Sequence, residues 1–123
     1  MIKNHPCEVA VVDDDPAVLE SFRFILEMAG YAVSTYPSAM AFLAAKERQP
    51  HCLILDHHMP MMTGLELARA LRNNGSTLPV LLITAAPSAA IAERAEEIGV
   101  AAVLEKPPAE DELLRFVSGC CAD

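Results

Sequence analysis

Acidic side chains, a threonine and a lysine stand at the ends of short apolar runs, where they could form one polar site. The residues concerned are Asp13, Asp14, Asp56, Thr84 and Lys106. Three carboxylates in one crevice would repel each other by about 4 kcal/mol per pair at a separation of about 4 Å. Because one lysine neutralises only part of this charge, a hard divalent cation with oxygen ligands, such as Mg²⁺, is the natural complement. A cation, a lysine and a hydroxyl together stabilise a transferring phosphoryl group, and a remaining carboxylate is a candidate nucleophile that would form an aspartyl phosphate.

The acids before Pro16 also have a purely structural interpretation. Asp13, Asp14 and Asp15 could cap a helix that begins at Pro16, because a carboxylate accepts hydrogen bonds from the free amides of a first helical turn. We expect Asp15 to have this role. For Asp13 and Asp14, the coincidence with an acid, a threonine and a lysine at three other run ends favours the polar site.

Five short runs predict the strands that must position these residues. The predicted strands are Glu8–Asp13, Ala32–Tyr36, Cys52–Asp56, Val80–Thr84 and Ala101–Glu105. Four of them are almost continuously apolar, which is typical of parallel strands covered by helices on both faces. The run from 32 to 36 alternates between apolar and polar residues, so we expect it at an edge of the sheet.

Segments of helical period separate the strands. Helices are predicted after Asp15-Pro16 as far as Gly30, after Ser38, from Leu65 to the Asn73-Asn74-Gly75 turn, from Ser88 to Gly99, and from Glu110 onward. The alternation predicts an α/β fold of the (βα)5 type, with a doubly wound, five-stranded parallel sheet. Ligands of such sheets bind beyond the carboxyl ends of the strands, which is where the polar residues fall.

Composition limits the other possibilities. The 123 residues, 53% of them hydrophobic, suffice for one domain with a core of its own, so we expect residues 1–123 to form a single domain. The net charge of −8 disfavours direct binding to nucleic acid or to an anionic membrane. Every apolar stretch is too short to span a membrane, and "MIKNHPCE" lacks the apolar region of a signal peptide. We therefore expect a cytoplasmic protein.

The four cysteines do not have the spacing of a metal site. Cys7 and Cys52 each lie in an apolar run, where a reduced cysteine behaves as a small hydrophobic residue. The adjacent Cys120 and Cys121 have no expected role. The sequence therefore predicts that Cys7 and Cys52 are core thiols.

Four motifs together resemble the receiver domain of bacterial two-component response regulators. They are "VVDDDP", "LILDHHMPMMTG", "LLIT" and "LEKP", and the pattern D-x-x-M-P-x-M-x-G is complete from Asp56 to Gly64. The resemblance covers the whole chain and implies a CheY-like, flavodoxin-like sheet of strand order 2-1-3-4-5. The first predicted helix and "YPSAMAFL" resemble the nitrogen-fixation and LuxR-type subgroup.

The resemblance implies a role for each polar residue. Asp56 would be the phosphoacceptor. Asp14 and Asp56 would ligate Mg²⁺ (or Mn²⁺) together with the backbone carbonyl of His58, and Asp13 would act on the ion mostly through water. Lys106 would pair with a phosphoryl oxygen, held by a cis peptide bond to the following proline, which costs little energy before proline.

The same resemblance implies a switch and a modulator. Thr84 would swing its hydroxyl onto the phosphoryl group and pull the loop that begins at Ala85. Val103 stands where the family usually has an aromatic residue, so we expect a signal that passes through Thr84 and this loop without an aromatic partner. His58 and Ala86 occupy the positions that influence the phosphoryl lifetime, and we expect His58 to dominate because the methyl group of Ala86 cannot position a water molecule.

A sensor histidine kinase or a phosphotransfer protein is the implied phosphodonor, with Met61 as a candidate contact. The implied surface for a homodimer or an output domain comprises the helix after Ser88, the last strand and the last helix. The chain would be either a complete relay or a receiver excised from a longer regulator. Two other classes remain open: a Mg²⁺-dependent phosphohydrolase, although its usual second acid is replaced by His58, and a non-phosphorylated scaffold of the same fold.

Overall fold

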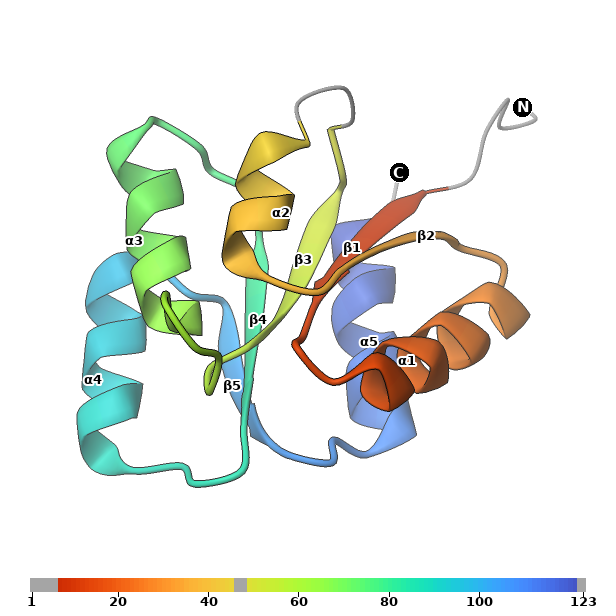
Figure 1. Cartoon of the computed structure of the whole chain (residues 1–123). Helices are drawn as coiled ribbons and strands as arrows, with labels where there is room; N and C mark the ends of the chain where they lie inside the picture. The colour runs from red at the N-terminus through yellow and green to blue at the C-terminus, as the bar shows by residue number, and fades with distance from the viewer. Residues whose placement is uncertain (1–6, 46–48, 122–123) are drawn as a thin grey trace.

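The computed structural model describes residues 7–45 and 49–121, in which strands and helices alternate along the chain (Figure 1). The strands are β1 (Glu8–Val12), β2 (Ala32–Tyr36), β3 (Cys52–Asp56), β4 (Val80–Thr84) and β5 (Ala102–Glu105). The helices are α1 (Pro16–Met28), α2 (Ala39–Ala44), α3 (Gly64–Asn73), α4 (Ala89–Ile98) and α5 (Glu110–Cys120). The predicted (βα)5 alternation is confirmed, with strand ends that differ by at most one residue.

All four strand pairs are parallel, and the sheet order is β2-β1-β3-β4-β5, as the resemblance implied. Every residue of β3 and β4 is buried, as their unbroken apolar sequences predicted. Every residue of β2 is half-buried, in agreement with its alternating sequence and its predicted edge position. The central strands are therefore covered on both faces.

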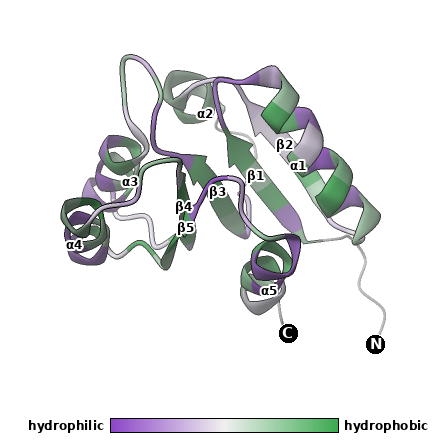
Figure 2. Ribbon diagram, turned by 90° about the horizontal axis from the view of Figure 1, so that it is seen from below, coloured by the Kyte–Doolittle hydropathy of each residue, from purple (hydrophilic) through white to green (hydrophobic). Residues whose placement is uncertain are grey.

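Alternate residues of the strands enter two separate cores. Val12, Leu55 and Leu82 face the layer formed by α2, α3 and α4. Val11 and Ile54 face the layer formed by α1 and α5. In Figure 2 the hydrophobic strands lie between these helices. In the central strands the polar side chains therefore lie at the strand ends, and the carboxyl ends carry the residues of interest.

Local hydrogen bonds explain where the helices begin. The carboxylate of Asp15 accepts a hydrogen bond from the amide of Ala17, which confirms its predicted role as a cap. Ser38 and Ser88 cap α2 and α4 in the same way, also as expected. The sequence analysis did not anticipate that Thr63 forms a capping box with Glu66 at the start of α3.

The prediction that Cys7 is a core thiol was wrong. A disulfide joins Cys7 to Cys121, across a sequence separation of 114 residues. Because α5 runs back along the sheet, its end comes beside the start of β1, a proximity that sequence spacing does not reveal. Cys52 is buried and unbonded, as expected, and Cys120 is free and half-buried.

In the ranges 7–45 and 49–121, no helix is long and apolar enough to cross a membrane. The N-terminal stretch from which we argued against a signal peptide lies, up to residue 6, outside the described residues.

Candidate functional site

Three carboxylates meet at the carboxyl ends of β1 and β3. Asp13 and Asp56 are almost fully buried, at 1% and 4% exposure, whereas Asp14 is exposed. One oxygen of each carboxylate lies within 4.8 Å of the others. Asp13 is held in place because its Oδ1 accepts a hydrogen bond from the amide of Asp15 at 2.9 Å. The predicted clustering of these acids is confirmed.

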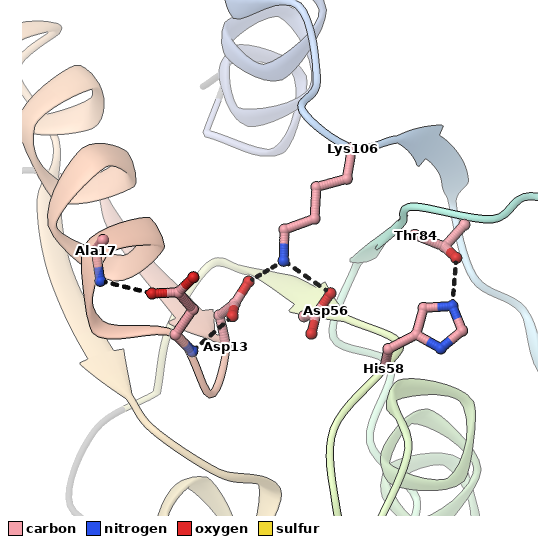
Figure 3. Close-up of polar contacts among 7 residues, drawn as sticks. Asp13, Ala17, Asp56, His58, Thr84 and Lys106 are labelled. Atoms are coloured by element: carbon pink, nitrogen blue, oxygen red, sulfur yellow. Dashed lines mark hydrogen bonds and ion pairs between the residues drawn. The ribbon is translucent and has the colours of Figure 1, made fainter.

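Lys106, just beyond the end of β5, is the cation of this site. Its Nζ donates to Oδ2 of Asp13 at 2.9 Å and to Oδ1 of Asp56 at 3.2 Å (Figure 3). Its backbone amide donates to the carbonyl of Thr84 at 2.9 Å, which fixes the lysine relative to β4. The peptide bond between Lys106 and Pro107 is cis, as the resemblance implied.

Burial and neighbouring charges shift the pKa values of Asp56 and Lys106. Burial and then the charge of Asp13 raise the pKa of Asp56, and the opposing effect of Lys106 does not cancel them. Burial by itself would lower the pKa of Lys106, but its hydrogen bonds and ion pairs with Asp13 and Asp56 outweigh burial and raise it. Burial is thus the main cause of the raised pKa of Asp56, whereas the two acids are the cause of the raised pKa of Lys106.

The donor set fits a hard divalent cation. Three carboxylate oxygens from Asp13, Asp14 and Asp56 offer the ligand type that Mg²⁺ prefers, and the exposure of Asp14 gives an ion access from solvent. An added cation would also favour the ionised form of Asp56, which burial and the charge of Asp13 disfavour. The part taken by the backbone carbonyl of His58 stays a prediction.

Thr84 lies beside this cluster, completely buried at the end of β4. Its Oγ1 accepts a hydrogen bond from the amide of Ala86 at 3.1 Å and lies 3.1 Å from Nε2 of His58 (Figure 3). The contact with His58 was not anticipated. Strand register could have indicated it, because Asp56 of β3 pairs with Ile83 of β4. His58 comes two residues after Asp56, and Thr84 comes one residue after Ile83.

Comparison with known proteins identifies the family. The model of the response regulator receiver domain matches residues 9–118, which include all five of the polar residues described above. The chain belongs to this family. It is thus related to the signalling phosphoacceptors of two-component systems, and nothing in the matches favours a phosphohydrolase or a scaffold.

Relatives of this receiver include transcriptional regulators. The transcriptional regulatory protein FixJ of Azorhizobium caulinodans is 41% identical over 80% of the chain, which covers 47% of FixJ. The response regulator MprA of Mycobacterium sp. (strain KMS) is 38% identical over 89% of the chain, which covers 48% of MprA. The chain therefore spans about half the length of these curated relatives.

Solved receiver structures have the same fold. The crystal structure of FixJ-N superimposes with a TM-score of 0.84 at 31% identity and covers 98% of this chain and 95% of its own. The chemotaxis protein CheY4 of Vibrio cholerae gives a TM-score of 0.86 at 28% identity, with coverage of 94% and 98%. The likeness to FixJ agrees with the subgroup named from the sequence.

The remaining predicted positions of the receiver lie in the loop after β4 and in β5. Ala85 and Ala86 are exposed at the start of the loop that leads to α4. Val103, in β5, is half-buried and packs against the core under α2, α3 and α4. The side chain at this position is thus short and branched, not aromatic.

Gly64 is a residue of the receiver site to which the sequence analysis gave no role beyond the motif. A Cβ atom there would lie 2.5 Å from the carbonyl oxygen of Asp56 and 2.9 Å from Cα of His57. The amide of Gly64 donates to the carbonyl of His57 at 3.0 Å. The absence of a side chain thus lets α3 begin directly against the end of β3, which the glycine that closes the D-x-x-M-P-x-M-x-G pattern could have indicated.

Proposed function

We propose that Asp56 is the phosphoacceptor of this receiver and takes a phosphoryl group from a phosphohistidine. A carboxylate oxygen of Asp56 would form the new P–O bond while the P–N bond breaks, and the released imidazole would keep the electron pair and take up a proton. The donor would be a sensor histidine kinase or a phosphotransfer protein. The observation that carries the proposal is that Lys106 bridges the buried Asp56 and Asp13 at the carboxyl edge of the sheet.

The other residues would prepare the acceptor. Asp13, Asp14 and Asp56 would hold Mg²⁺ (or Mn²⁺), and the bound cation would neutralise charge on the phosphoryl oxygens. Lys106 would exchange a carboxylate contact for a phosphoryl oxygen. Thr84 would then donate its hydroxyl proton to the phosphoryl group, and the loop that begins at Ala85 would follow. The chain would thus catalyse only its own phosphorylation and dephosphorylation.

Residues 1–123 would act as one receiver domain in the cytoplasm. Support comes from the single parallel sheet and from the family match over residues 9–118. Met61 is 96% exposed in the loop after β3 and is available to a phosphodonor protein. The outer face of α4, β5 and α5 would serve a homodimer or an output domain, and neither nucleic acid nor membrane is expected to bind this chain directly.

His58 is expected to control how long the phosphoryl group persists. Its ring lies beside Thr84, whereas the methyl group of Ala86 can neither position nor block a water molecule. The rate of autodephosphorylation of His58→Ala tests this expectation, and a rate equal to that of the wild type would contradict it.

One assay tests the phosphoacceptor and separates the three function classes. The protein is incubated with acetyl phosphate and Mg²⁺, and the intact mass and released phosphate are followed over time. We expect one slowly lost phosphoryl group per chain, absent from Asp56→Asn and unchanged in the surface control Glu97→Gln. Many turnovers would indicate a hydrolase, and no adduct on the wild type would indicate a scaffold.

A further inference from the structure

The hydroxyl of Thr84 is engaged from two sides. A hydroxyl group has one proton and two lone pairs. The Ala86 amide uses one lone pair, at 3.1 Å, and belongs to the loop that follows β4. The contact with Nε2 of His58, also at 3.1 Å, uses either the hydroxyl proton or the second lone pair. The hydroxyl therefore already has a side-chain partner from the loop after β3.

The two histidines beside the site have different environments. Nδ1 of His57 lies 3.4 Å from the amide of Leu65, at the start of α3. The ring of His58 reaches Thr84 at the end of β4 instead (Figure 3). His58 is exposed, whereas Thr84 is completely buried. Of the two rings, only that of His58 pairs with the hydroxyl.

The backbone of Thr84 cannot move far with its side chain. It is the last residue of β4, where it pairs with Glu105 of β5, and its carbonyl accepts the amide of Lys106 at 2.9 Å. A change of partner by the hydroxyl therefore requires rotation of the side chain and release of the contact with His58. The loop that begins at Ala85 is the backbone segment that can follow.

We infer that His58 is the resting-state partner of the Thr84 hydroxyl and so a positioning residue for the switch. This inference rests on the proposed function, in which the same hydroxyl moves to a phosphoryl group on Asp56. The imidazole ring and the phosphoryl group compete for one hydroxyl group. Removal of the ring leaves the resting state with one partner fewer and favours the phosphorylated arrangement.

Beryllofluoride binding in the presence of Mg²⁺ measures this competition. We expect His58→Ala to bind the analogue about two- to tenfold more tightly than the wild type, which is the range that a single net hydrogen bond gives. His58→Gln, which can keep a polar partner near Thr84, should restore the wild-type affinity. His51→Ala removes a histidine that directly precedes β3, at the amino ends of the strands, and serves as the control.

The double variant shows whether the effect passes through Thr84. In a Thr84→Ala background, His58→Ala should leave the affinity for beryllofluoride unchanged, because the hydroxyl for which the two partners compete is gone. An equal gain in both backgrounds, or no gain in His58→Ala alone, would overturn the inference. Wild-type protein that fails to bind beryllofluoride would overturn the proposed function as well.

A measurement on the free protein separates the two failures. NMR couplings of a labelled Thr84 side chain, recorded without Mg²⁺ or phosphodonor, report its χ1 rotamers. We expect one rotamer in the wild type and in His58→Gln, and averaging between rotamers in His58→Ala. An unaltered rotamer in His58→Ala would overturn the positioning role even if Asp56 is phosphorylated normally.

Discussion

Asp56 combines two properties that oppose each other in a folded protein. It is buried next to a second carboxylate, so its ionised form is disfavoured, and yet a nucleophile must be ionised. Lys106 compensates only in part, because its ammonium group is shared with Asp13. In the absence of a divalent cation, the ionised site therefore lowers the stability of the fold.

This conflict predicts that Asp56→Asn stabilises the protein at neutral pH. The folded-state pKa of Asp56 is raised above its unfolded value of about 3.9, so the penalty is full above the folded pKa and is lost as the pH falls toward the unfolded value. In chelator-treated buffer at pH 7 we expect a gain on the order of 1 kcal/mol in the free energy of unfolding. Urea titrations followed by circular dichroism at pH 7 and near pH 4 measure the gain and its loss. A gain that is independent of pH would contradict the electrostatic cause.

A second prediction concerns the cation itself. Mg²⁺ at ten times its dissociation constant should stabilise the wild type by about 1.4 kcal/mol, because it binds only the folded site. Asp14→Asn should lose most of this stabilisation, whereas Asp111→Asn, at the exposed start of α5, should keep it. Urea titrations with Mg²⁺ and with NaCl of matched ionic strength measure the difference. Equal stabilisation by both salts would argue against a specific site.

At the scale of elements, the site depends on how closely α3 approaches β3. Gly64 lies against the backbone of Asp56 and His57, and the capping box of Thr63 and Glu66 starts the helix there. The loop that carries His58 is thereby confined between a strand end and a helix start. A side chain at position 64 would displace one of them.

Gly64→Ala is accordingly expected to destabilise the protein by about 1–3 kcal/mol, the usual cost of overpacking. The added Cβ would meet the Asp56 carbonyl oxygen at 2.5 Å and Cδ1 of Leu82 at 2.8 Å. Gly119→Ala is the matched control, because a Cβ there meets nothing within 4 Å and alanine stabilises a helix by up to about 1 kcal/mol. Opposite signs in urea unfolding would support this account, and equal effects would refute it.

The elements and much of the site could be predicted because they follow from local patterns. Unbroken apolar strands imply a parallel sheet, and a parallel sheet brings Asp13, Asp56 and Lys106 to one edge. The contact between His58 and Thr84 depends on a ring rotamer and on strand register, which no local pattern contains. The cap at Thr63 was overlooked although its T-x-x-E spacing was readable.

At the scale of the whole molecule, the carboxyl ends and the amino ends of the strands have different chemistry. The carboxyl ends carry the acids and Lys106. The disulfide between Cys7 and Cys121 lies at the amino ends of the strands. Cys52 begins β3 there and pairs with Val9 of β1. The disulfide could not be predicted from spacing, because it depends on the return path of α5.

Reduction of this disulfide is expected to lower the free energy of unfolding by about 2–4 kcal/mol, because the bond restricts a very long loop of the unfolded chain. Cys7→Ser should be as unstable as the reduced wild type and should not respond to dithiothreitol. Urea unfolding with and without reductant tests both statements, and Cys120→Ser is the control for a free thiol. In a reducing compartment the pair would be present as thiols.

The Cα atoms of Cys7 and Cys121 are only 5.8 Å apart, so the described part of the chain begins and ends at neighbouring points. A short glycine-serine bridge could replace the sulfur link, and new termini could be opened at the exposed turn of Asn74 and Gly75. Such a circular permutant would be synthesised from β4 onward but would keep the same neighbours in the sheet. The fold would then not depend on the position of the N-terminus in the sequence.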